Sequence, residues 1–398
     1  MIEKNLERLS TETSILPPTR PVYLDHHATT PVDPRVFAAM KPWLTERFGN
    51  AASISHRYGD EARDAVEQAR RQIAALVNCE PTEVIFTSGA TEANNLALKG
   101  FLWQVGKECE LIVNRGEHKA VLDPAERLSR DGYSVNTIEI NRVGQVETDS
   151  LAEALSAHTG LVSVMFANNE VGTINPIAEI AELCSERKIR LHCDAVQAVG
   201  ILDVDLQQVP IDLLSLSAHK FYGPQGVGAL IVRRDRGRIP LTPLLDGGGH
   251  ERHLRSGTLP VALIVGFGEA CRLAQAEKSA DSQRLSKLRD RLWNRLASQL
   301  SGLHRNGPPD NCLPQNLNVS VEGVDGDALM TGLTKIAVSS GSACTSADPA
   351  PSHVLRAMGL SESLTKASLR FGLGRSTTEE EIDLAIEHVT EVVQHLRS

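Results

Sequence analysis

The strongest chemical signal in the sequence is a lysine that closes an apolar run, in the segment SLSAHKFYGPQG. Lys220 follows Ser217 and His219 and precedes a turn rich in Gly and Pro. A lysine beside hydroxyl and imidazole groups that can bind phosphate is what a Schiff base to an aldehyde cofactor requires. On these residues alone, the lysine could also be a surface side chain after a strand.

Two further strand-to-helix junctions carry polar residues. In TSGATEANN, residues 87–95, free backbone N–H groups at a helix start could cradle a phosphate, with the Thr91 hydroxyl beside them. In HCDAVQAVG, Asp194 could pair with a protonated pyridine nitrogen, the partner that a pyridoxal phosphate (PLP) ring needs as an electron sink. Taken alone, the first junction is typical of an ordinary capped turn and the second of a helix cap.

Cys344 lies in VSSGSACTSADPAPSHVL, a run of small residues that has no capacity to bury itself. Its thiol should therefore be accessible, and accessibility together with thiolate character sets the reactivity of a cysteine. An incidental surface thiol is the alternative. Nearer the N-terminus, residues 25–30 form a polar cluster with two adjacent histidines, for which we predict a structural role at a strand entrance and no metal site.

The elements that must position these residues alternate between strands and helices. This alternation predicts a mostly parallel sheet with helices on both faces, whose ligands bind beyond the carboxyl ends of the strands. One amphipathic helix is predicted from the spacing of its apolar residues, which are Ala62, Val66, Ala69, Ile73 and Leu76. The β-rich runs that predict the strands are residues 83–88, 110–114, 134–140, 161–167, 189–195, 212–218 and 229–234.

Beyond the glycine-rich residues 246–258, the pattern changes to long helices with a charged break near residues 277–282. Strands at LNVSV and IAVSS and a closing helix from Thr378 then predict a smaller α+β domain. We predict an N-terminal arm over residues 1–30 that packs partly with the small domain. A large cofactor-binding domain over 31–275 and a small domain over 276–398 follow, the latter carrying the cysteine loop at 338–353.

The composition of the 398-residue chain is that of a soluble globular protein with room for two domains, 41% hydrophobic and 23% charged. Its net charge of −9 argues against nucleic-acid binding, which is typical of basic surfaces. The seven cysteines are scattered singly, which indicates a reducing cytosol rather than disulfides or a zinc site. We find neither a signal peptide nor an apolar run of the roughly 18 residues that a membrane span needs, so we predict a cytoplasmic protein without membrane contact.

Taken in order, these segments resemble the cysteine desulfurases, and the resemblance extends from Val22 to the C-terminus. The lysine motif alone is typical of the wider fold-type I PLP enzymes, whereas SSGSACTS is similar to the longer-loop, housekeeping desulfurases of the class V aminotransferase family. The resemblance implies a fold-type I α/β architecture with a seven-stranded sheet. The segments that carry it are YLDHHATTPVDP, TSGATEANNLALKG, EHKAVLD, NNEVGTINPI, HCDAVQAVG, SAHKFYGPQGVGAL, GGGHERHLRSGTLP, SSGSACTS and LRFGLGR.

The resemblance also implies a reaction and its residues. PLP and L-cysteine would give L-alanine and a persulfide on Cys344, and the sulfur would pass to acceptors such as an iron–sulfur scaffold or a tRNA-thiolation relay. Lys220 would form the Schiff base and later act as the base at the substrate α-carbon, and His118 would stack on the cofactor ring. Asn169 and Arg370 would clamp the substrate carboxylate, and Asn169 would also contact the cofactor.

The remaining cofactor contacts are likewise implied by the resemblance. Asp194 would hold the pyridine nitrogen and Gln197 the phenolic oxygen. The residues that would bind the phosphate are Ala90, Thr91, Ser217, His219 and, from the second subunit of a homodimer, Thr258.

Three alternatives stay open beside this hypothesis. A cysteine or cystine C–S lyase would need no protein thiol, and a selenocysteine lyase would fit the same site. A non-catalytic assembly scaffold should have lost Lys220 or the phosphate ligands. The sequence DPAP after Cys344 adds two prolines that could stiffen the loop.

Overall fold

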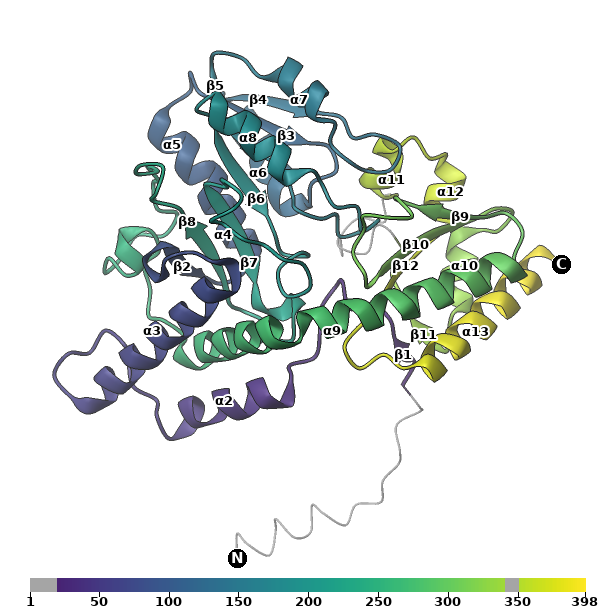
Figure 1. The fold of residues 1–398 in the computed structure, drawn as a ribbon, viewed down its shortest axis with the longest axis horizontal. Helices are drawn as coiled ribbons and strands as arrows, with labels where there is room; N and C mark the ends of the chain where they lie inside the picture. The colour runs from purple at the N-terminus through teal and green to yellow at the C-terminus, as the bar shows by residue number, and fades with distance from the viewer. Residues whose placement is uncertain (1–19, 341–350) are drawn as a thin grey trace, which may run out of the picture.

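The computed structural model of the chain describes residues 20–340 and 351–398. Its largest element is a seven-stranded sheet with the strand order β2-β8-β7-β6-β5-β3-β4 (Figure 1). Neighbouring strands are parallel except at β8, which is antiparallel to both β2 and β7. The predicted mostly parallel sheet is thus confirmed, and each β-rich run overlaps one strand. The strands are β2 (Val84–Thr87), β3 (Glu110–Asn114), β4 (Ser134–Ile138), β5 (Thr159–Ser163), β6 (Arg190–Asp194), β7 (Leu213–Ser217) and β8 (Gly228–Val232).

Helices cover both faces of this sheet, because successive side chains of a strand point to opposite faces and both sets are apolar. Val84 and Phe86 belong to one hydrophobic cluster, whereas Ile85 between them belongs to another. The predicted amphipathic helix is α3, and all five of its predicted apolar residues are buried. The helices along this part of the chain are α2 (Pro34–Thr45), α3 (Arg57–Val77), α4 (Ala90–Asn95), α5 (Phe101–Val105), α6 (Lys119–Arg130), α7 (Thr148–Ala154) and α8 (Ile177–Glu186).

A third hydrophobic cluster forms around a three-stranded antiparallel sheet with the order β12-β10-β9. The closing helix α13 (Glu379–Arg397) begins at Thr378, whose side chain and that of Glu381 form a capping box. The N-terminal segment joins this part through β1 (Val22–Tyr23), which pairs in parallel with β11 (Ile336–Ala337). The other elements are β9 (Leu303–Asn306), β10 (Asn316–Val321), α10 (Gly326–Gly332), α11 (His353–Ala357), α12 (Glu362–Lys366) and β12 (Ser368–Gly372).

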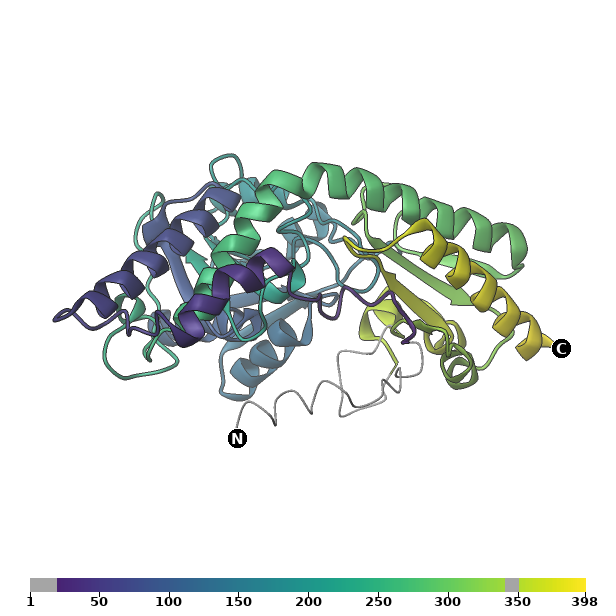
Figure 2. The same cartoon turned by 90° about the horizontal axis from the view of Figure 1, so that it is seen from below.

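One helix, α9 (Val261–Gln299), runs from the large-sheet part to the small-sheet part (Figures 1 and 2). The expected break near residues 277–282 is wrong, because the helix continues through these residues. Its charged side chains there form ion pairs with other segments, Glu277 with Arg35 and Asp281 with Arg375. The predicted domain boundary at residue 275 falls within this helix and stays a prediction.

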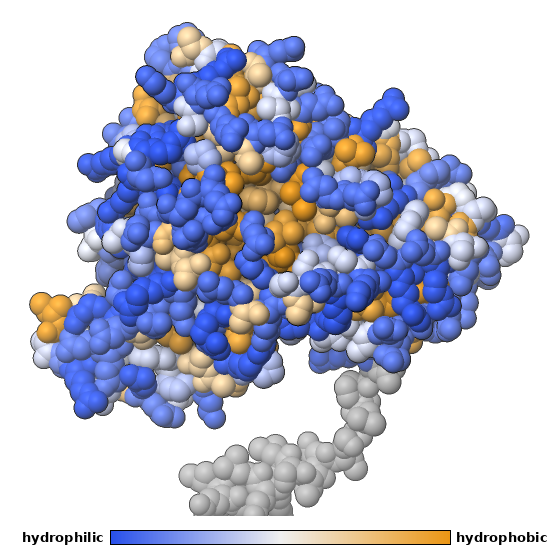
Figure 3. Space-filling view, in the orientation of Figure 1, coloured by the Kyte–Doolittle hydropathy of each residue, from blue (hydrophilic) through white to orange (hydrophobic). Residues whose placement is uncertain are grey.

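The surface in the view of Figure 3 is mostly hydrophilic, with apolar residues gathered near the middle of the face. In the described ranges, none of the helices is long and apolar enough to cross a membrane. Large hydrophobic side chains are exposed most often between residues 37 and 58, in the α2–α3 region. They are Phe37, Leu44, Phe48, Ile54 and Tyr58.

Candidate active site

A pocket of about 540 Å³ opens at the carboxyl ends of the strands of the large sheet. Asp194 is the last residue of β6 and Ser217 the last residue of β7, and both face this pocket. Because parallel strands end at the same edge of a sheet, side chains far apart in the sequence meet there. The predicted site residues that line the pocket are Ala90, Thr91, His118, Asn169, Asp194, Gln197, Ser217, His219 and Lys220.

One side of the pocket combines a helix start with hydroxyl and imidazole groups. Gly89, which precedes α4, has a φ of 154°, a backbone conformation that L side chains rarely adopt. A Cβ atom placed on Gly89 would lie 3.9 Å from Ser217 Oγ, so this turn lies close to the end of β7. Burial, followed by the charge of Lys220, lowers the pKa of His219 to about 4, so its imidazole is neutral at pH 7. These groups form a cradle suited to a phosphate.

A buried carboxylate lines the pocket at the end of β6. Asp194 Oδ2 accepts a 2.7 Å hydrogen bond from Asn94 Nδ2, and its Oδ1 accepts a 3.1 Å bond from the backbone N–H of Val196. Asn94 is fully buried on α4, and the sequence analysis did not single it out. Two donors from different elements therefore fix the orientation of the Asp194 carboxylate.

Lys220 points toward the N-terminal segment. Its Nζ donates hydrogen bonds to the backbone carbonyls of His27, at 2.6 Å, and Ala28, at 2.8 Å. His27 and Ala28 also line the pocket, so the purely structural role expected for residues 25–30 is incomplete. No local pattern of residues indicates this contact, because the lysine lies 193 and 192 positions from its two partners.

His27 also sets the position of Gln197. Its Nδ1 lies 2.8 Å from Gln197 Oε1, and Gln197 Nε2 donates to the His27 carbonyl at 3.1 Å. Because an amide oxygen only accepts, the Nδ1 of His27 must carry the proton. Burial is the largest cause that lowers the pKa of His27 to about 3, which keeps the ring neutral.

His118 is the N-cap of α6, and its Nδ1 accepts a 3.0 Å hydrogen bond from the backbone N–H of Ala120. The proton of the neutral ring therefore lies on Nε2. The preceding residue, Glu117, is fully buried, and burial followed by the charge of Asp194 raises its pKa well above the ordinary value. Glu117 Oε1 accepts a 2.6 Å hydrogen bond from the backbone N–H of Met165.

Two predicted site residues of the described chain do not line the pocket. Arg370, in β12, is fully buried, and it donates to Asp25 Oδ1 at 2.8 Å and to the backbone carbonyl of Asn169 at 3.1 Å. It therefore contacts the pocket-lining Asn169 from the small-sheet part. Thr258 is exposed, and Cys344 lies outside the described residues.

The comparisons with known proteins give the family of the chain. A family model described as "Aminotransferase class-V" matches residues 22–384. A relative named "Cysteine desulfurase IscS" from Anaeromyxobacter dehalogenans (strain 2CP-C) is 51% identical over 380 residues, 95% of this chain and 93% of the relative. The chain belongs to the cysteine desulfurases.

Solved structures agree with this placement of the desulfurase. A structure titled "NIFS-LIKE PROTEIN" is 36% identical, with a TM-score of 0.88 over 94% of this chain and all of that one. Another, titled "SspA in complex with cysteine", is 37% identical, with a TM-score of 0.78 over 88% of this chain and 98% of that one.

PLP is the cofactor of this enzyme family, and the pocket residues fit it. The pocket is large enough for a small cofactor and combines a lysine, a buried carboxylate and a phosphate cradle. Among the residues described by the structure, no group of three or more His, Cys, Asp or Glu side chains is placed to hold a metal ion. The donor set thus favours an organic phosphate cofactor over a metal.

Proposed function

We propose that this desulfurase removes sulfur from L-cysteine, releases L-alanine and carries the sulfur as a persulfide on Cys344. The single observation that supports this most strongly is the pocket that holds Lys220, Asp194 and a phosphate cradle together.

The pocket residues would hold the cofactor at four points. Asp194 would accept a hydrogen bond from the pyridine nitrogen, and Gln197 would lie at the phenolic oxygen. His118 would stack on the ring. The phosphate would lie in the cradle, whose proposed ligands are Ala90, Thr91, Ser217 and His219, with Thr258 of a second subunit.

Different side chains of the enzyme would then bind the substrate and transfer its protons. Bound PLP supplies an electron sink that acidifies the α-hydrogen of the amino acid. Arg370, with Asn169 beside it, would hold the substrate carboxylate. Lys220 would remove the α-proton, and the Nε2–H of His118 would be placed to donate a proton near the ring.

The Cys344 thiolate would then attack the substrate sulfur. A sulfur–sulfur bond forms as the bond between Cβ and sulfur breaks, and Cβ keeps the electron pair. After Cβ and the α-carbon take up protons, the carbon skeleton leaves as alanine. The thiolate rather than the thiol is the nucleophile in this step.

The other cysteines support the choice of Cys344, because burial makes most of them poor nucleophiles. Burial raises the pKa of Cys79 and of Cys184 to about 12. It also raises the pKa of Cys193 and Cys271 well above the ordinary value, and both thiols are fully buried. A thiol with so high a pKa contributes almost no thiolate at pH 7.

Product analysis tests the proposed function. The purified holoenzyme, given L-cysteine and a thiol reductant, is expected to release alanine and sulfide in equal amounts, and Cys344→Ser is expected to release neither. Cys312→Ser is the matched control, since Cys312 is partly exposed, and it should keep full activity. Pyruvate and ammonia that persist in Cys344→Ser would instead identify a C–S lyase, and a selenocysteine lyase would form alanine only from the selenium substrate.

We further propose a homodimer in which each subunit supplies Thr258 to the pocket of the other. Two observations support it: Thr258 is exposed and absent from the pocket lining, and exposed apolar side chains gather between residues 37 and 58. Burial of such apolar surface is the main driving force for association.

Subunit mixing tests this arrangement. Lys220→Ala and Thr258→Ala subunits are each expected to form dimers with impaired sites. If Thr258 acts across the interface, a mixed dimer contains one pocket with both native residues. The mixture should then regain about half of the wild-type activity per mixed dimer. A mixture no more active than its Thr258→Ala component, or a fully active monomer in sedimentation, would contradict the proposal.

The proposed sulfur acceptors are cytoplasmic proteins, such as an iron–sulfur scaffold or a tRNA-thiolation relay. The free cysteines of the described chain support a reducing compartment. Labelled sulfur from L-cysteine should pass to such a protein in a cytoplasmic fraction, and the same transfer in a secreted fraction alone would refute this.

A further inference from the structure

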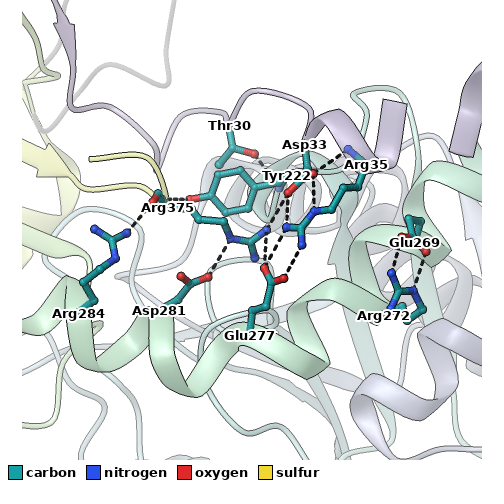
Figure 4. A network of polar contacts seen from close by, with 10 residues as sticks. All are labelled: Thr30, Asp33, Arg35, Tyr222, Glu269, Arg272, Glu277, Asp281, Arg284 and Arg375. Atoms are coloured by element: carbon teal, nitrogen blue, oxygen red, sulfur yellow. Dashed lines mark hydrogen bonds and ion pairs between the residues drawn. The ribbon is translucent and has the colours of Figure 1, made fainter. Parts of the chain in front are cut away.

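Outside the pocket, a cluster of charged side chains lies where the two parts of the molecule meet (Figure 4). It joins the start of α2, the middle of α9 and the segment that follows β12. Along α9, Ala274 packs in the core of the large-sheet part and Leu285 in the core of the small-sheet part. The charged cluster lies on the stretch of α9 between these two residues. Along this stretch of α9, the contacts between the two parts are polar.

Arg375 is at the centre of this cluster and contacts three carboxylates. Its Nε donates to Asp281 at 2.9 Å, and its Nη1 lies 3.1 Å from Asp33 and 3.3 Å from Glu277. Only 18% of the Arg375 side chain is exposed. Arg35 is the second cation here, and it pairs with Asp33 and Glu277 but is 48% exposed. Removal of Arg375 would leave Asp33 and Glu277 paired with the solvated Arg35, and it would take away the cation that pairs with Asp281.

Arg375 also holds Tyr222. The backbone N–H of Arg375 donates to the Tyr222 hydroxyl at 2.5 Å, and the guanidinium lies 4.4 Å from the centre of the tyrosine ring. Tyr222 has a φ of 70°, which is unusual for a bulky residue and costs on the order of 1–3 kcal/mol, so surrounding contacts must maintain it. Thr30 and Asp33 complete these contacts by bonding its backbone N–H and carbonyl.

Tyr222 and Arg375 are each close in sequence to a proposed active-site residue. Tyr222 lies two residues after Lys220, and Arg375 lies five residues after Arg370. Lys220 belongs to the large-sheet part and Arg370 to the small-sheet part, and the substrate must contact both. A contact that fixes Tyr222 against Arg375 therefore fixes the spacing between the proposed proton acceptor and the proposed carboxylate clamp.

We propose that Arg375 is a positioning residue, which holds Tyr222 and thereby keeps Lys220 in register with Arg370. The inference rests on the proposed function, because it uses the roles proposed for these two residues. Arg375 itself touches neither the pocket nor, in this arrangement, the substrate.

The test replaces the guanidinium and separates binding from chemistry. In Arg375→Gln, KM for L-cysteine is expected to rise roughly tenfold. The reason is that a shift of Arg370 by a fraction of an ångström weakens its hydrogen bonds to the substrate carboxylate. kcat is expected to fall about three- to tenfold as well, because Lys220 then lies out of register with the α-carbon of the bound substrate. Arg375→Lys should recover part of the change in KM, because it restores the charge without the planar fork.

A second readout does not depend on activity. Hydrogen exchange of the backbone amides should accelerate in residues 219–223 and 369–375 of Arg375→Gln, while the exchange of α3 remains unchanged. Arg272→Gln is the matched control, since Arg272 is an exposed guanidinium of α9 that pairs only with Glu269 in Figure 4. It should alter neither KM nor exchange.

A merely structural role would lower the unfolding temperature of Arg375→Gln and leave KM at the wild-type value, and this outcome would overturn the proposal. So would equal changes in Arg375→Gln and Arg272→Gln. If Arg375→Gln does not fold, Tyr222→Phe removes only the hydroxyl acceptor, and KM should rise about two- to threefold, as for one lost hydrogen bond. An unchanged KM in that variant also overturns the proposal. Wild-type enzyme that forms no alanine in the same assay would instead mark a failure of the proposed function.

Discussion

Lys220→Ala is expected to lower kcat/KM for alanine formation by at least about 10⁴-fold, the largest effect of any substitution considered. The amine would serve both as the covalent anchor of the cofactor and as the acceptor of the α-proton, so a single substitution removes both functions. The near-visible absorption band of the bound cofactor should also change. An unchanged band after reduction and dialysis would refute the assignment of the lysine.

Two control variants separate the chemistry of Lys220 from its hydrogen bonds. Lys220→Arg keeps a cation that can reach the carbonyls of His27 and Ala28, but its guanidinium is neither a nucleophile nor a base at neutral pH. It should fold well and be as inactive as Lys220→Ala. Lys119→Ala removes a solvated lysine paired with Asp123 and should keep wild-type activity.

Asp194→Asn is expected to lower kcat by about 10³-fold, because an amide cannot stabilise a positive charge on the pyridine nitrogen. The substitution also disturbs the hydrogen bonds of the side chain. Both oxygens of Asp194 already accept hydrogen bonds, from Asn94 and Val196, and an amide offers only one oxygen to the same donors. The measurement is steady-state alanine formation at saturating PLP, with cofactor retention after gel filtration as the second readout.

Glu117→Gln is the matched control for Asp194→Asn. Glu117 is the neighbouring buried acid whose pKa is raised by burial and by Asp194, and the hydrogen bonds it accepts from Asn114 and Met165 both go to Oε1. An amide of the same shape keeps this oxygen, so it should change kcat by less than about threefold. If the two variants are equally inactive, the assignment of the catalytic charge to Asp194 alone is wrong.

Local sequence was sufficient for the elements that carry the site. Six of the strands were predictable because they are short runs buried on both faces, whereas the edge strand β4 is partly exposed. The helix α3 was predictable because its apolar residues recur every three or four positions. The convergence of Asp194 and Ser217 followed from the same reasoning, since strands of a parallel sheet end at one edge. The charge run at residues 277–282 misled the prediction, because Glu277 and Asp281 find partners outside their helix.

The sequence by itself determined the strands, the amphipathic helices and which chemical groups stand at the strand ends, because these depend on periodicity and on neighbours within a few residues. Only the tertiary structure decided that Lys220 bonds the carbonyls of His27 and Ala28, and that Arg370 meets Asp25 across 345 positions. It also decided that Arg375 contacts Tyr222, through a backbone hydrogen bond and a cation–π contact. Such contacts depend on how two separately packed sheets are placed against each other, and no local pattern of residues encodes that placement.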